Sequence, residues 1–89
     1  MIAVLHTGAF RHDVKIIAKR GWQLSKLYDV INHICAGKQF PPSFRLHKLK
    51  GEYSGCWECH IEADWLLVWE VRQDHILLIR TGSHADLFE

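Results

Sequence analysis

The sequence predicts an α+β fold in which two N-terminal helices pack on a mostly antiparallel β-sheet. Apolar residues recur at helical spacing in the first part of the chain, up to about residue 35. After residue 55 they alternate with polar residues or run continuously, as they do in strands. Short polar connections at residues 62–64 and 73–74 have the composition of turns between neighbouring strands. The expected order is β-α-α-β-β-β with a short helical turn at the C-terminal end.

The N-terminal half is expected to form one strand and two helices. Residues 2–5 are a β-prone run, and Thr7 is placed to cap the helix that follows. Gly21 ends this first helix, and a second helix spans about residues 24–35. The apolar faces of the two helices consist of Phe10, Val14 and Ile17 in the first and Leu24, Leu27, Ile31 and Ile34 in the second. We expect the helices to pack as an antiparallel pair on one face of the sheet.

The C-terminal half is expected to supply the antiparallel strands. Residues 40–43 contain two prolines and break the helical pattern, and residues 45–51 form a basic loop. The strands are expected at residues 56–61, 65–69 and 76–79. Residues 81–88 break the last strand and form a final helical turn, for which Ser83 is the cap. Because the helices cover one sheet face, the other face is expected to stay open and to be available for a site.

Length and composition limit the class of protein. Residues 1–89, of which 48% are hydrophobic and 24% charged, are expected to form one globular domain. No apolar run approaches the ~20 residues that span a bilayer, so no membrane association is expected. The N-terminus lacks the pattern of a signal peptide, and we expect a cytoplasmic protein whose three cysteines are free thiols.

The net charge of +1 combines two oppositely charged halves. Residues 1–50 contain nine Lys/Arg against two Asp/Glu, which gives +7, and residues 51–89 contain two against eight, which gives −6. A basic half suits a polyanion or an acidic protein partner. Solvated helices with outward-facing lysines explain the same asymmetry, so both interpretations stay open.

Three histidines and one carboxylate are candidates for a shared cleft. Strand alternation places Glu58 and His60 on the face away from the helices. Asp64 begins the next strand, His47 lies in the loop before the sheet, and His84 in the turn after it. RNA can be cut without a metal when one group takes the proton of the 2′-hydroxyl and another protonates the leaving 5′-oxygen. Histidine can fill either role because its pKa lies near neutrality.

Three segments of the chain closely resemble the YafQ branch of the RelE/ParE toxin superfamily. They are residues 59–68, residues 80–88 and the preceding loop at residues 47–51, and the likeness extends over nearly the whole chain. The resemblance implies a RelE-like fold. It also implies a toxin of a type II toxin–antitoxin pair that enters the ribosomal A site and cleaves mRNA there, without a cofactor.

The resemblance also implies roles for individual residues. His47 corresponds to the general base and His84 to the general acid, although these two labels can be exchanged. His60 and Asp64 would hold the phosphate and tune the imidazoles, and Phe88 would stack on a base. The residues expected to contact substrate are Arg45, Lys48, Lys50, Trp65, Arg80 and Phe88. The implied partner is a DinJ-like antitoxin of the ribbon-helix-helix class, which wraps the toxin in a heterotetramer.

Two alternatives remain open from the sequence. The chain has Cys56-Trp57 where the family usually has Tyr-Arg, and Ala63 where proline is usual. A catalytically weak or inactive protein that mainly binds an antitoxin is therefore the first alternative. The second is haem or metal binding by the Cys-x-x-Cys-His string at residues 56–60. Against it, an extended strand would direct Cys56 and Cys59 to opposite faces.

Overall fold

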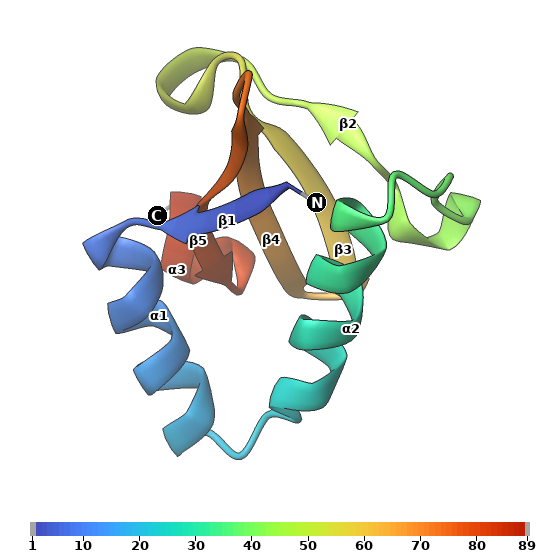
Figure 1. The fold of residues 1–89 in the computed structure, drawn as a ribbon. Coiled ribbons are helices and arrows are strands. Elements are labelled where there is room, and N and C mark those ends of the chain that lie inside the picture. Colours follow the sequence, from blue (N-terminus) through green and yellow to red (C-terminus); the bar gives the residue numbers. More distant parts are fainter. Residues whose placement is uncertain (1, 89) are drawn as a thin grey trace.

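The computed structural model, which describes residues 2–88, confirms the predicted α+β class (Figure 1). A five-stranded mixed sheet has the strand order β1-β5-β4-β3-β2. Helices α1 and α2 lie on one side of the sheet, and the short α3 lies on the other (Figure 1). The elements are β1 (Ala3–His6), α1 (Gly8–Lys19), α2 (Leu24–Cys35), β2 (His47–Lys48), β3 (Trp57–Glu62), β4 (Trp65–Val71), β5 (His75–Gly82) and α3 (His84–Phe88).

The sheet is antiparallel except at one edge. Strand β1 pairs in parallel with β5, so the first strand of the chain lies beside the last. At the opposite edge the two-residue β2 pairs His47 with Glu58 and Lys48 with Trp57 of β3. The sequence did not predict β2, because two residues are too few to carry an alternation pattern. Its formation fixes the basic loop against the sheet instead of leaving it free.

The helices begin and end close to the predicted positions. Thr7 is the N-cap of α1, and its side-chain oxygen accepts a hydrogen bond of 2.9 Å from the Phe10 backbone N–H. The bounds of α2 agree with the predicted residues 24–35. One polar residue does not follow the expected pattern. Asp13 of α1 is buried, because its place three residues after Phe10 and four before Ile17 puts it on the apolar face of the helix.

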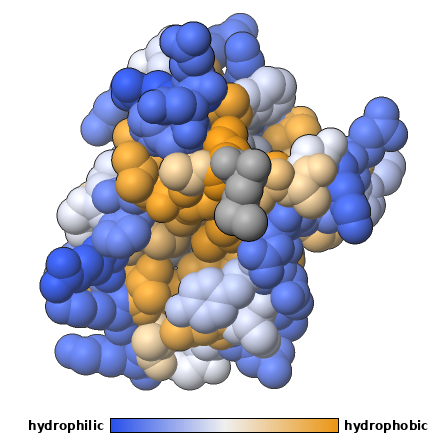
Figure 2. Space-filling model, in the orientation of Figure 1, coloured by the Kyte–Doolittle hydropathy of each residue, from blue (hydrophilic) through white to orange (hydrophobic). Residues whose placement is uncertain are grey.

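The helical side of the molecule presents an apolar surface (Figure 2). Hydrophobic residues gather over β1 and between the two helices, with hydrophilic residues around them. A groove here is lined by apolar side chains, and His6, Arg11 and Lys15 also border it. We call this feature the helical groove. Its other lining residues are Val4, Phe10, Val14, Tyr28, Ile31 and Leu78.

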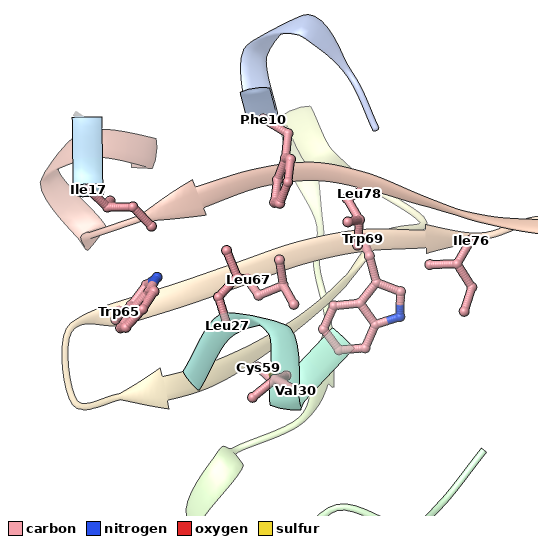
Figure 3. Close-up of a cluster of buried hydrophobic side chains, with 10 residues drawn as sticks. All are labelled: Phe10, Ile17, Leu27, Val30, Cys59, Trp65, Leu67, Trp69, Ile76 and Leu78. Atoms are coloured by element: carbon pink, nitrogen blue, oxygen red, sulfur yellow. The ribbon is translucent and has the colours of Figure 1, made fainter. Parts of the chain in front are cut away.

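The main core fills the space between the two N-terminal helices and the sheet (Figure 3). Its buried members are Phe10, Ile17, Leu27, Val30, Cys59, Trp65, Leu67, Trp69, Ile76 and Leu78. Strand β4 supplies Trp65, Leu67 and Trp69, which alternate with residues that face the other way. Burial of such large side chains is worth about 1.5–3 kcal/mol each, so β4 organises the fold.

The second face of the sheet is covered rather than open, which corrects the prediction. Cys56, Leu66, Val68 and Leu87 form a smaller buried cluster there, with Leu49, Tyr53 and Ile79 packed around it. Because β4 is apolar on both faces, it needs a cover on both sides. Helix α3 and the segment before β3 provide this cover. A site on this side must therefore lie at the rim of the sheet.

No helix among residues 2–88 is long and apolar enough to cross a membrane.

Candidate active site

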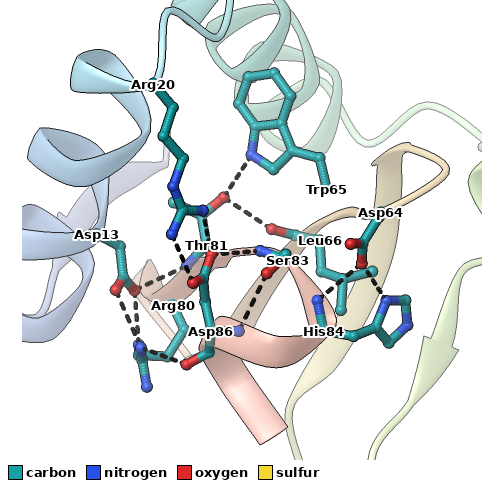
Figure 4. A network of polar contacts seen from close by, with 10 residues as sticks. All are labelled: Asp13, Arg20, Asp64, Trp65, Leu66, Arg80, Thr81, Ser83, His84 and Asp86. Carbon is teal, nitrogen blue, oxygen red and sulfur yellow. Dashed lines mark hydrogen bonds and ion pairs between the residues drawn. The ribbon is translucent and has the colours of Figure 1, made fainter. Parts of the chain in front are cut away.

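Asp64 and His84 form the centre of the candidate site (Figure 4). Asp64 lies in the turn between β3 and β4, and His84 is the first residue of α3. The Oδ1 atom of Asp64 accepts a hydrogen bond of 2.9 Å from the His84 backbone N–H and lies 2.6 Å from His84 Nδ1. The backbone N–H and then the imidazole of His84 lower the pKa of Asp64. A carboxylate at Nδ1 favours a proton on that nitrogen and leaves Nε2 available for a substrate.

Further rings surround the His84 imidazole. The His60 ring centroid lies 5.6 Å from that of His84, and the Phe88 ring centroid lies 6.4 Å from it. Tyr53 packs edge-on against Phe88 at 5.9 Å. The Nδ1–H of His60 donates to the Ala63 carbonyl at 3.3 Å, which orients the His60 ring. Because Phe88 is 47% exposed, the cluster ends in an aromatic face directed at solvent.

His47 lies on the same sheet face as His60 and contacts the buried Glu58. Its Nδ1–H donates to the Arg45 carbonyl at 2.7 Å, and its Nε2 lies 3.2 Å from Glu58 Oε1. Glu58 and His60 are two residues apart on β3, so they share a face at a Cα spacing of about 7 Å. The structure thus places His60, Asp64 and His84 in one cluster, and His47 on the same sheet face beside Glu58, near the start of β3.

Glu58 is a candidate site residue that the sequence did not predict. It is 4% exposed, and within residues 2–88 its Oε2 atom has no hydrogen-bond partner. A buried carboxylate with an unpartnered oxygen is costly, so such a residue points to function. Its position on the same strand face as His60, beside the loop that carries His47, was the signal available in the sequence.

The chain matches a known protein family over nearly its whole length. Residues 2–89 match a family described as "Bacterial toxin of type II toxin-antitoxin system, YafQ". The chain belongs to the YafQ toxin family. It is 30% identical over 84 residues to the mRNA interferase toxin YafQ of Escherichia coli K12, with 93% of this chain and 91% of the relative covered.

Solved structures of bacterial toxins share the fold. YafQ from Escherichia coli BL21(DE3) superimposes with a TM-score of 0.92 at 27% identity and 100% coverage of both chains. A copper-bound mutant toxin from Helicobacter pylori gives a TM-score of 0.92 at 34% identity, covering 99% of this chain and 100% of that one. The toxin of the Escherichia coli DinJ–YafQ complex gives 0.89 at 28% identity, with 99% and 98% covered.

The basic loop of this YafQ-family chain stays at the surface. Arg45, Lys48 and Lys50 are exposed, as substrate contacts would require. Arg45 adopts a left-handed backbone conformation with φ of 50° at the end of a short 3₁₀ helix. The Lys48 ammonium lies 5.2 Å from the centre of the Trp57 ring, a cation–π contact that restrains this side chain. Their predicted role in substrate binding remains a prediction.

Trp65 and Arg80 lie beneath the site and support it. Trp65 is 2% exposed, and its indole N–H donates to Thr81 Oγ1 at 3.0 Å. We therefore correct the predicted substrate contact for Trp65, because a buried ring cannot meet RNA in this conformation. The Arg80 guanidinium is bound by Asp13 at 2.6 Å and 3.0 Å and by the Tyr53 hydroxyl at 3.2 Å. Asp13, the first of these partners, raises the pKa of Arg80.

The Cys-x-x-Cys-His string does not form a two-thiol site in this fold. Cys56 belongs to the cluster under α3, whereas Cys59 belongs to the main core on the opposite sheet face. Burial raises the pKa of both thiols, and that of Cys59 to about 12. Neither thiol is poised as a thiolate for a haem vinyl group or a metal. Within residues 2–88, no cluster of three or more His, Cys, Asp or Glu could hold a metal ion.

Proposed function

We propose that this YafQ-family toxin is an mRNA interferase, an endoribonuclease that cleaves messages by metal-independent acid–base chemistry. The Escherichia coli K12 relative is named as an mRNA interferase toxin. The observation that carries the proposal is the carboxylate–imidazole pair of Asp64 and His84 beside the ring of His60. Proton transfer by positioned groups of this kind contributes roughly 10²–10⁴-fold to a rate.

The proposed reaction divides two proton transfers between His47 and His84. His47 takes the proton of the 2′-hydroxyl, which attacks the adjacent phosphorus and forms a 2′,3′-cyclic phosphate. His84 protonates the leaving 5′-oxygen from Nε2, while Asp64 fixes the ring through Nδ1. His60 binds the phosphate between them, and Phe88 stacks on a base. The proton goes to His47 Nε2, because Nδ1–H is held by the Arg45 carbonyl, and the Glu58 carboxylate beside Nε2 stabilises the imidazolium that forms.

The proposed substrate is mRNA on the ribosome, in the cytoplasm. The exposed Arg45 and Lys50 contact phosphates next to the cleaved bond, at the edge of the sheet where His47 lies. Lys48 alternates with His47 along β2 and lies over Trp57 on the helical side of the sheet, so we expect any contact that it makes with RNA to be away from the cleaved bond. Phosphate contacts by such side chains position a nucleic acid without reading its sequence. Binding through phosphates, which does not depend on the RNA sequence, suits an enzyme that cleaves many messages.

The proposed partner is a DinJ-like antitoxin of the ribbon-helix-helix class, in a heterotetramer. A DinJ–YafQ toxin–antitoxin complex is among the structures with this fold. The helical groove offers an apolar floor with Arg11 and Lys15 at its border. An amphipathic antitoxin segment with acidic residues on its outer face would fit both features.

The proposed function is tested with His84→Ala, His47→Ala and wild-type protein incubated with mRNA on ribosomes at constant Mg²⁺, which the ribosomes need, with and without a chelator selective for transition metals. We expect wild-type cleavage in the chelator, ends that carry a 2′,3′-cyclic phosphate, and a rate at least ~10²-fold lower in each variant. RNA that carries sulfur at the cleaved 5′-position needs no general acid. It should restore cleavage by His84→Ala but not by His47→Ala.

Three results would count against this function. Absence of wild-type cleavage would favour a protein that only binds its antitoxin. Dependence on a transition metal would contradict the acid–base mechanism. Rescue of His47→Ala, instead of His84→Ala, by the sulfur substrate would exchange the two roles.

A further inference from the structure

Helix α3 is too short to hold its own position, although it carries two residues of the proposed site. It has five residues, of which His84 is the first and Phe88 the last. Isolated helices of fewer than ~12 residues are marginal in water, so contacts outside the helix must fix it. Leu87 anchors its buried side. Apolar anchoring alone does not set the rotation of the first turn, on which the direction of the His84 ring depends.

Asp86 closes the first turn of α3 through two hydrogen bonds with Ser83. The Asp86 backbone N–H donates to Ser83 Oγ at 3.1 Å, and Asp86 Oδ2 accepts from the Ser83 backbone N–H at 2.9 Å. This reciprocal pair has the pattern of a capping box at the start of the helix. His84 lies between the two capping residues, so the cap fixes the backbone N–H that His84 donates to Asp64.

Arg20 then clamps the cap from a distant part of the chain (Figure 4). Its Nη1 and Nη2 atoms donate to the two oxygens of Asp86 at 2.6 Å and 2.9 Å, across 66 residues of sequence. A bidentate guanidinium–carboxylate pair fixes direction as well as distance. Hydrogen bonds from Arg20 hold the pKa of Asp86 well below the usual range. The Arg20 guanidinium also lies 5.4 Å from the Trp22 ring centre, which limits its motion.

A second contact from the same helix supports the strand that leads into α3. Arg20 is the C-cap residue of α1 and keeps a helical backbone conformation. Asp13 lies seven residues before it, two turns of helix, so both side chains project from the same face. Asp13 binds Arg80 and accepts from the Thr81 backbone N–H at 3.1 Å. Arg80 in turn donates to the Asp86 carbonyl at 3.4 Å. One face of α1 therefore holds both the end of β5 and the first turn of α3.

We propose that Arg20 and Asp86 are positioning residues for the RNA-cleavage reaction, which aim His84 at its substrate through the first turn of α3. This inference rests on the proposed function for the reaction that it serves. Neither residue needs to touch RNA. Loss of the clamp lets the turn rotate, weakens the Asp64–His84 pair and misplaces the His84 ring. Misplacement by about 1 Å can lower a rate by as much as ~10²-fold.

The test compares Arg20→Gln and Asp86→Asn with Lys19→Gln, which removes one positive charge from the adjacent exposed residue of α1. We expect kcat for RNA cleavage to fall about 10- to 100-fold in the first two variants, with KM within about twofold. The double variant should lose no more than either single variant, because the two residues act as one unit. Lys19→Gln should keep both constants, and Arg20→Lys should recover part of kcat.

A second measurement needs no RNA and separates this inference from the proposed function. In the free protein, NMR titration of the Asp64 carboxyl should show its pKa rising towards the ordinary value of about 3.9 in both Arg20→Gln and Asp86→Asn, but not in Lys19→Gln. The rise in Asp86→Asn would report geometry, because loss of the Asp86 charge would by itself lower the pKa of Asp64. The inference is overturned if Arg20→Gln keeps both the wild-type kcat and the wild-type pKa of Asp64. If the wild type cleaves no RNA, the titration still decides whether the clamp positions His84. If the amide spectrum shows that Arg20→Gln does not fold, kcat and the pKa of Asp64 are measured in Arg20→Lys instead. Wild-type values of both in that variant would overturn the inference.

Discussion

Gly82 joins β5 to α3 with a backbone φ of 150°, and any side chain at this position would meet Asp86. An added Cβ would lie 2.8 Å from Asp86 Oδ2 and 3.0 Å from Asp86 Cβ. The carboxylate cannot easily move aside, because Ser83 and Arg20 both bind it. Glycine is therefore required here by conformation and by space together.

Gly82→Ala should lower the free energy of unfolding by about 1–3 kcal/mol, the usual cost of such backbone strain. Gly8→Ala is the matched control, because a Cβ there has no atom within 4 Å and the residue begins α1. That substitution should be neutral or stabilise by up to about 1 kcal/mol. Urea unfolding of the three proteins measures both values. Equal stability of Gly82→Ala and the wild type would show that the turn tolerates a side chain.

Individual residues also mark what the sequence could and could not predict of the site. His60, Asp64 and His84 were identified from a motif, and the fold brings them together because the end of β3, the β3–β4 turn and the start of α3 lie side by side. Asp13 and Glu58 were not predicted as buried charges, because helical or strand spacing alone cannot tell which polar residue finds a partner across the core. That partner is Arg80 for Asp13 and His47 for Glu58.

Cys59 in β3 and Cys56, just before this strand, are buried on opposite faces of the sheet, and this arrangement has a chemical consequence. Cys59 is fully buried against α2 and the core, and Cys56 is buried on the other face. Burial that raises the pKa of both thiols also prevents reagent access. Cys35 at the end of α2 packs against the edge of the main core but is only half-buried, so it is the more accessible thiol.

Treatment of the native protein with a disulfide reagent at pH 8 should therefore modify Cys35 alone. Modification of Cys56 and Cys59 should follow the rate of unfolding, since only an opened sheet exposes them. Cys35→Ser provides the control, in which no thiol should react before denaturant is added. Rapid reaction of two thiols in Cys35→Ser would mean that β3 does not hold them in separate clusters. It would reopen the Cys-x-x-Cys-His alternative.

Elements differ in how well the sequence predicts them. Helix α2 was predicted within its observed bounds, because its apolar period runs over three turns and flanking residues end it. Strand β2 was not predicted, since its two residues gain their conformation from pairing with β3. The open second face was expected because only two helices were counted as cover. The five residues of α3 and the Tyr53 segment complete that cover.

Across the whole molecule, the helical groove and the site residues share no side chain. The groove lies over β1 and between α1 and α2, whereas the site lies at the turn after β3 and at α3. The central sheet separates them. Antitoxin binding in the groove and RNA cleavage at His84 should therefore respond to different substitutions.

Tyr28→Glu in the groove tests this separation against Val71→Glu, because Tyr28 is 52% exposed and Val71, outside the groove, is 55% exposed. Loss of a central interface tyrosine commonly costs about 2 kcal/mol or more, and an added negative charge would repel an acidic segment. Tyr28→Glu should weaken antitoxin affinity about 10- to 100-fold by calorimetry, while Val71→Glu stays within about twofold. Both variants should cleave RNA at the wild-type rate. Equal loss in the two variants would place the antitoxin on another surface, and loss of cleavage in Tyr28→Glu would show that the two faces are coupled through the sheet.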